Sequence, residues 1–222
     1  MLAEIDAASE ARHRKTMFEE VSNARADMKA GTLYAASGEN SWIYYGQITS
    51  EKKVGFFRRR DHAIADPDMI LASPIMSIIT VAYPSITRAL RQGLWKKLGR
   101  LSVAKSLQKP QPSVQWPVGT LMVTIWEEGS ENRDTTVDDP AIQEMELMAV
   151  WDAEHHLPAR LTADFGVEPG EWHIGGPIGR ERKIKEEMAR RFPDTPWHQM
   201  PADWVFTTAE KKDTPEGSEG QS

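Results

Sequence analysis

Asp152, Glu154, His155 and His156 form the densest group of potential metal ligands in the sequence. Carboxylate and imidazole side chains can bind divalent metals or transfer protons, so either chemistry would be open to such a group. Adjacent side chains such as His155 and His156 point apart, however, and the chain has neither an HExxH helix motif nor an EF-hand loop. We therefore favour a structural or surface role for this group, and the sequence predicts no metal site.

A glycine-rich turn over residues 172–183 (WHIGGPIGRERK) offers a second possible chemistry, the binding of an anion. The turn precedes a basic helix, and the free N–H groups at a helix N-terminus can hold a phosphate. Its spacing matches neither of the common nucleotide-binding glycine motifs, and Pro177 removes one N–H donor. A simple turn into a helix is favoured. An enzyme that acts on an anionic small molecule near 172–185 is the third-ranked function.

Nucleophilic and acid–base catalysis have little further support. No serine lies in a GxSxG motif, and the absence of cysteine excludes disulfides, thiolate zinc sites and iron–sulfur clusters. Paired acidic residues such as Glu127 and Glu128 lie in a polar loop, without the hydrophobic surroundings that a buried general acid requires. The sequence therefore predicts a protein that is not an enzyme and has no cofactor.

A basic segment at 52–60 (KKVGFFRRR) lies near several aromatic residues. Basic grooves lined by aromatic rings bind single-stranded nucleic acid by stacking. The rings in question are Tyr44, Tyr45, Phe56 and Phe57. Strand periodicity places about half of them in a core, and a net charge of −6 argues against a dedicated nucleic-acid-binding protein. A nucleic-acid-binding module is therefore the second-ranked function, and nucleic acid is not the expected partner.

The charges are unevenly distributed along the 222 residues. Residues 1–120 carry 17 Lys and Arg against 11 Asp and Glu, whereas residues 121–222 carry 10 against 22. Such an asymmetry can steer a charged partner, although the two regions could equally lie side by side and partly neutralise each other. The segment 127–140 is predicted to be an acidic, flexible loop. Its candidate partner-binding residues are Glu127, Glu128, Glu131, Asp134, Asp138 and Asp139.

The elements that must position these residues indicate an α+β fold, with a bent antiparallel sheet or half-barrel and peripheral N- and C-terminal helices. Alternating apolar and aromatic residues predict strands, and 3.6-residue periodicity bounded by Gly or Pro predicts helices. The predicted strands are 32–36, 41–49, 53–59, 69–72, 75–83, 119–127, 145–151 and 203–207; the predicted helices are 2–28, 103–108, 158–165 and 179–192. Trp42, Trp95, Trp126 and Trp151 are expected in the core.

The chain is expected to comprise an N-terminal helix over 1–29, one α+β domain over 30–207 and a disordered tail over 208–222. Residues 69–87 hold no charge, but two prolines interrupt them, so buried strands are favoured over a membrane helix. The N-terminus lacks the apolar region of a signal peptide. We expect a cytoplasmic location, no membrane partner and an undetermined oligomeric state.

Three stretches, in order, resemble the Immunity protein 26 family of bacterial polymorphic toxin systems. The first, AGTLYAASGENSWIYYGQITSEKKVGFF (30–57), has a Gly-led strand, a Tyr-Gly strand and a Gly-Phe-Phe strand. The second, LWKKLGRLSVAKSLQKPQP (94–112), has a Trp-x-x-Leu-Gly step before a Pro-rich segment. The third, MELMAVWDAEHHLPARL (145–161), has a Glu-led strand that ends in Val-Trp.

The resemblance covers roughly residues 30–165, and residues 1–29 and those after about 170 lie outside it. It implies a non-enzymatic antitoxin that protects its own cell by blocking a cognate toxin, encoded next to it. It supplies no catalytic residues. An acidic loop suits such a role, because many toxins have cationic substrate clefts that carboxylates can occupy.

Overall fold

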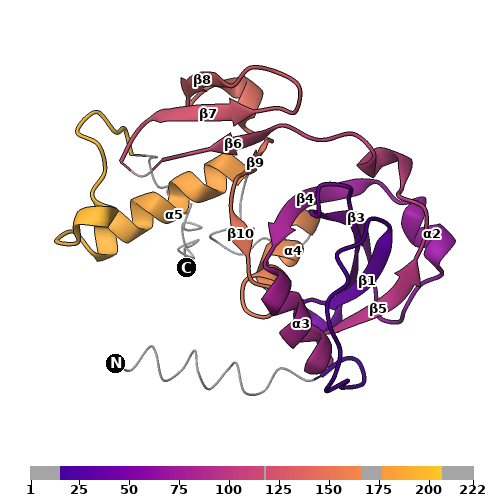
Figure 1. The fold of residues 1–222 in the computed structure, drawn as a ribbon. Coiled ribbons are helices and arrows are strands. Elements are labelled where there is room, and N and C mark those ends of the chain that lie inside the picture. The colour runs from indigo at the N-terminus through magenta and orange to yellow at the C-terminus, as the bar shows by residue number, and fades with distance from the viewer. Residues whose placement is uncertain (1–15, 118, 167–176, 207–222) are drawn as a thin grey trace, which may run out of the picture.

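The computed structural model describes residues 16–117, 119–166 and 177–206, and these residues form an α+β fold with two sheets (Figure 1). The larger sheet is a strongly curled half-barrel with strand order β10-β4-β3-β2-β1-β5. The smaller sheet has the order β8-β7-β6-β9. The predicted fold class, with its bent antiparallel sheet or half-barrel, is therefore confirmed.

The large sheet is antiparallel except at one edge. Its strands are β1 (Thr32–Ser37), β2 (Ile43–Ile48), β3 (Val54–Asp61), β4 (Ile75–Val81), β5 (Trp95–Arg100) and β10 (Val150–Trp151). β10 pairs with β4 in the parallel sense. Register shifts in the β1–β5, β2–β3 and β3–β4 pairs mark bulges, which increase twist and bend a sheet. The bulges account for the curl that closes the half-barrel.

Both faces of the large sheet carry a hydrophobic core, which explains why β1, β2 and the first half of β3 are fully buried. One face packs its aromatic residues against α3 (Tyr83–Arg91) and α4 (Leu157–Phe165). The other face packs against α2 (Pro67–Leu71) and the short 3-10 helix η3 (Lys105–Leu107). Trp95 is 2% exposed and lies in the first of these cores.

Among the described residues, the small sheet is covered on one face only. Its strands are β6 (Ser113–Gln115), β7 (Met122–Trp126), β8 (Arg133–Thr136) and β9 (Glu146–Leu147), and α5 (Pro177–Arg191) runs along one side of it (Figure 1). Val114, Val123 and Ile125 pack with Ile178 of α5. The remaining 3-10 helices are η2 (Glu39–Ser41), η4 (Pro140–Ile142) and η6 (Pro196–His198).

The predicted N-terminal helix is wrong for residues 16–29, which lie in turns and extended backbone; residues 1–15 lie outside the described part. The extended segment is held by other elements. Met17 and Phe18 donate backbone hydrogen bonds to Gly93 O, and Ala26 donates to the hydroxyl of Thr87. These contacts replace the hydrogen bonds that the predicted helix would have made. That helix would have buried little apolar surface, because its apolar stripe is thin.

Local capping overturned a second prediction. Residues 69–72, predicted as a strand, lie mainly in α2, because Asp66 accepts a hydrogen bond from the N–H of Asp68 and Pro67 occupies the first turn. The stretch after β4 forms the helix α3, also with Pro in its first turn. The predicted strand 203–207 is wrong for 203–206, and residue 207 lies outside the described part.

The late helices were predicted correctly. α4 ends at Gly166, whose φ of 78° is the left-handed conformation that glycine adopts readily, and α5 closely matches the predicted 179–192. The single strand predicted at 145–151 is instead split into β9 and β10, each pairing with a different sheet. None of the helices in the described ranges has both the length and the apolar character required to cross a membrane.

Candidate protein-binding surface

The six acidic residues predicted to bind a partner lie on and around one hairpin, formed by β7 and β8. The predicted flexible loop is therefore partly wrong, since residues 133–136 form the strand β8. Glu127, Glu128 and Glu131 are exposed in the turn at the tip of this hairpin. Asp138 and Asp139 follow β8 and lie at the opposite end, because Thr136 pairs with Met122 at the start of β7. The structure thus separates the acidic residues into two groups.

The three aspartates have intramolecular roles. Asp134 accepts a hydrogen bond from Thr124 Oγ1 at 2.7 Å, and Asp138 pairs with Arg182 of α5 at 2.5 Å. Asp139 caps η4 through the N–H of Ala141. The Thr135 hydroxyl and then this N–H hold the pKa of Asp139 below its usual value. These aspartates stabilise the hairpin and its contact with α5.

The three glutamates at the tip have no such role. Within the described ranges, the carboxylates of Glu127, Glu128 and Glu131 form neither an ion pair nor a hydrogen bond. An exposed carboxylate without an internal partner is available to a cation on another molecule. The tip is therefore the part of the predicted acidic site whose carboxylates have no partner among the described residues.

Next to this tip lies the uncovered face of the small sheet. Met122 and Trp126 alternate with the buried Val123 and Ile125, and are 49% and 40% exposed. The indole Nε1 of Trp126 donates to the side-chain oxygen of Gln115 at 3.1 Å, which fixes the ring. The prediction that Trp126 belongs to the core is wrong. Val123 and Ile125 face the core instead. Successive side chains of a strand point to opposite faces, so Trp126 faces away from this core.

Trp126 also lines a hollow of about 260 Å³ where the hairpin approaches the large sheet. One wall comes from Glu51 and Lys53 in and after the turn before β3, and these two side chains pair at 3.0 Å. Glu127 and Glu128 form part of another wall. Segments far apart in the sequence thus combine an indole ring with carboxylates. No sequence pattern predicted this combination.

The basic aromatic segment 52–60 is arranged differently from its prediction. Its candidate stacking rings, Tyr44, Tyr45, Phe56 and Phe57, are each 0% exposed. Its arginines have internal partners. Arg58 donates to the carbonyl of Phe165 at 2.9 Å, Arg59 pairs with Asp61 at 2.8 Å, and the Arg60 guanidinium lies 4.1 Å from the Trp42 ring centroid. The buried rings cannot stack on bases, so the prediction that these four rings stack on nucleic acid is wrong.

The group of potential metal ligands that follows β10 makes contacts that stabilise the fold. Potential ligand atoms of Asp152, Glu154 and His155 lie within 4.8 Å of one another. Arg88 of α3 pairs with Asp152 at 2.9 Å and with Glu154 at 2.5 Å. Asp152 also accepts hydrogen bonds from the backbone N–H groups of Glu154 and His155. Because Arg88 already pairs with both carboxylates, their oxygens are engaged within the chain.

In the glycine-rich segment 172–183, where a simple turn was favoured over an anion site, residues 172–176 lie outside the described ranges. In α5, Arg180 is buried and pairs with Asp164 at 2.5 Å. Arg182 contacts Asp138 and Glu186. The two arginines that the alternative anion site would use are therefore engaged by carboxylates of the chain itself.

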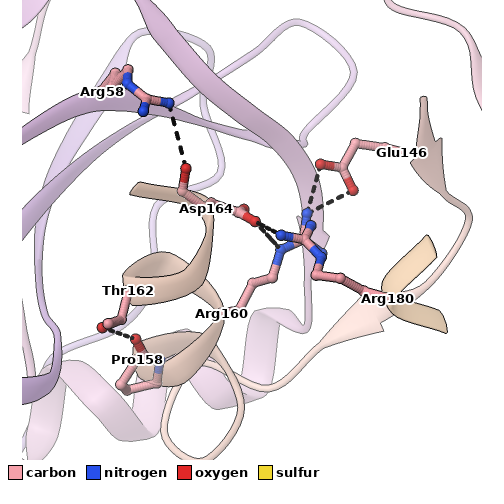
Figure 2. Close-up of polar contacts among 7 residues, drawn as sticks. All are labelled: Arg58, Glu146, Pro158, Arg160, Thr162, Asp164 and Arg180. Carbon is pink, nitrogen blue, oxygen red and sulfur yellow. Dashed lines mark hydrogen bonds and ion pairs between the residues drawn. The ribbon is translucent and has the colours of Figure 1, made fainter. Parts of the chain in front are cut away.

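A buried ion-pair cluster connects the two sheets, and it was not predicted (Figure 2). The Arg160 side chain in α4 is 4% exposed and pairs with Glu146 of β9 at 2.7 and 2.9 Å. Its Nε atom also contacts Asp164 at 2.7 Å, and Asp164 in turn binds Arg180 of α5. Two cations and two anions thus hold α4, β9 and α5 together. This cluster positions the small sheet, and hence the hairpin, on the half-barrel.

The cluster leads to a prediction of pH dependence. Burial raises the pKa of Glu146, against the opposing effect of Arg160, above its ordinary value of 4.5. A carboxyl group with a raised pKa binds its proton more tightly in the folded state, so its contribution to stability declines as the pH rises above about 4.5. Relative to a Glu146→Gln variant, the wild type should therefore lose free energy of unfolding between pH 4 and pH 7.

Urea unfolding of both proteins at several pH values measures this difference. The Glu146→Gln side chain cannot ionise, so subtracting its values removes the contributions of the other titrating groups. A difference that instead grows in favour of the wild type as the pH rises would mean that the attraction of Arg160 outweighs burial and lowers the pKa of Glu146.

Comparisons with known proteins found no match to this chain among protein-family models, curated proteins or solved structures. The resemblance to the Immunity protein 26 family therefore depends on the three stretches of sequence alone. In the structure these stretches form β1 to β3, β5 with η3, and β9 to α4. They include the half-barrel strands and the arginine at the centre of the ion-pair cluster.

Proposed function

We propose that this protein is a cytoplasmic immunity protein that binds a cognate bacterial toxin and blocks it without catalysis. One observation carries the proposal: Glu127 and Glu128, which have no ion-pair partner among the described residues, line one hollow with the exposed Trp126, and Glu131 lies in the same hairpin tip. A fixed aromatic ring surrounded by charge is typical of a protein-binding surface. The sequence resemblance supplies the class of partner, and the acidic surface suits a toxin with a cationic active-site cleft.

Co-expression tests the function directly. The open reading frame immediately upstream is induced with and without this protein, and growth and co-purification are measured. Rescue of growth together with a stable complex is the expected result. If the neighbouring product is not toxic and forms no complex, the immunity function is wrong. Filter binding of RNA and DNA at increasing salt then tests the nucleic-acid alternative.

Charge reversal tests the role of the hairpin tip. We expect the triple variant Glu127→Lys, Glu128→Lys and Glu131→Lys to associate with the partner about tenfold more slowly at low salt, because steering by the acidic tip is reversed. The matched control is Glu19→Lys, Glu20→Lys and Glu39→Lys, which changes the net charge equally at other exposed glutamates. Equal slowing in both variants, by stopped-flow fluorescence, would show that only net charge matters.

A further inference from the structure

Two clusters in the described part of the chain combine a tryptophan, an arginine and a carboxylate. Arg160 lies 4.7 Å from the ring centroid of Trp151 and pairs with Glu146. Arg182 lies 5.0 Å from the ring centroid of Trp204, and Glu186 binds both the guanidinium and the indole N–H. In each case the cation faces the π-system while an anion holds its N–H groups.

Trp126 has the ring and the carboxylates of this combination, but not the cation. It shares the hollow of about 260 Å³ with Glu127 and Glu128. Within the described ranges no Lys or Arg lies over its ring, and neither glutamate has an ion-pair partner. Lys53 lines the same hollow but is paired with Glu51, so it leaves the charge of the two glutamates uncompensated.

We infer that this hollow receives an arginine side chain of a basic protein partner, which completes the third combination. The inference rests on the proposed function and names the contact that anchors the partner. Charge complementarity selects the occupant, because the lining has two uncompensated negative charges and the adjoining sheet face is uncovered. A guanidinium suits the site better than an ammonium, because its planar fork can stack on the indole and bind carboxylate at its edge.

The hydrogen bond from Trp126 to Gln115 prepares the site for binding. The indole N–H already donates at 3.1 Å to Gln115, so the ring has no further polar requirement. A rigid aromatic side chain loses little conformational freedom when a partner binds. Trp197, by contrast, is 70% exposed on η6 and has neither the hollow nor these glutamates beside it. It provides an internal control.

Titration of the full chain with a minimal probe tests the inference. The probe is N-acetyl-arginine methylamide, the neutral comparison is N-acetyl-citrulline methylamide, and the readout is the indole ¹⁵N–¹H resonance of Trp126, assigned with a Trp126→Phe variant. We expect the arginine probe, and not citrulline, to shift this resonance with a millimolar dissociation constant. Trp197 should not respond. The variant Glu127→Gln with Glu128→Gln should bind the probe about threefold to tenfold more weakly.

Equal shifts with arginine and citrulline, or equal responses at Trp126 and Trp197, would overturn the inference. So would unchanged binding in the double glutamine variant, whose fold is checked by its unaltered amide spectrum. This experiment needs no toxin, whereas the co-expression experiment needs no arginine probe. A negative result for arginine binding in the hollow can therefore be told apart from a negative result for the immunity function.

Discussion

Replacing Arg160 with methionine should lower the free energy of unfolding by about 3–5 kcal/mol. The methionine fills much of the same volume, but Asp164 and Glu146 then lose a buried guanidinium that contacts both of them. The Asp164 side chain is 5% exposed, so water cannot replace the lost hydrogen bonds without opening the structure. Urea unfolding at pH 7 measures the loss.

A surface arginine provides the control for this substitution. Arg190 also pairs with a carboxylate, on Glu187, but its side chain is 56% exposed. Arg190→Met should therefore change the free energy of unfolding by less than about 1 kcal/mol. If the two variants lose the same amount, the cluster contributes no more than a surface pair.

The consequence for function can be measured on the same protein. Arg160 of α4 binds Glu146 of β9, and Arg180 of α5 binds Asp164, which Arg160 also contacts (Figure 2). Loss of Arg160 should therefore loosen the small sheet before the half-barrel. Hydrogen exchange should accelerate first in β6 and β7, while β1 to β3 keep their protection. Uniform acceleration across both sheets would mean that the two sheets unfold as one unit.

Local patterns along the chain were sufficient to predict the half-barrel. Segments 32–36, 41–49 and 53–59 carry dense aromatic and β-branched residues separated by polar turns, and each forms a strand. Gly166 and Pro193 likewise bound the late helices as expected. These signals act between neighbours in sequence, so they are visible without the fold.

The prediction failed where distant segments decide the outcome. Residues 16–29 have helical periodicity, but the extended segment gains hydrogen bonds to Gly93 and Thr87 that no local pattern reveals. Among the tryptophans expected in the core, Trp95 is buried, Trp42 and Trp151 are half-buried, and Trp126 is exposed. Which side of β7 faces α5 depends on tertiary packing.

The candidate site shows the same division. Composition was enough to identify an acidic segment, but not that Asp134, Asp138 and Asp139 would bind Thr124, Arg182 and η4. Nor could it reveal the hollow, whose walls come from the turn before β3 and from the end of β7. Sites assembled from separate segments require the fold before their chemistry can be recognised.

Replacing Trp95 with alanine should cost about 3–5 kcal/mol, the range for truncating a large buried aromatic side chain. Its ring lies 5.6 Å from that of Tyr34 and 6.2 Å from that of Phe56, inside the core of the half-barrel. The matched control is Trp197→Ala, which removes an indole that is 70% exposed and should change stability by less than about 0.5 kcal/mol.

Tyr34 reports whether the resulting cavity admits water. Burial raises the pKa of its hydroxyl to about 12, even though the backbone N–H of Asp27 donates a hydrogen bond to it. Hydration of the cavity should bring this pKa back toward its ordinary value of 10, whereas a dry cavity leaves it near 12. Ultraviolet titration of tyrosinate measures it. Loss of stability with an unchanged pKa would mean that packing contacts alone account for the contribution of Trp95, and that the core keeps its form around the void.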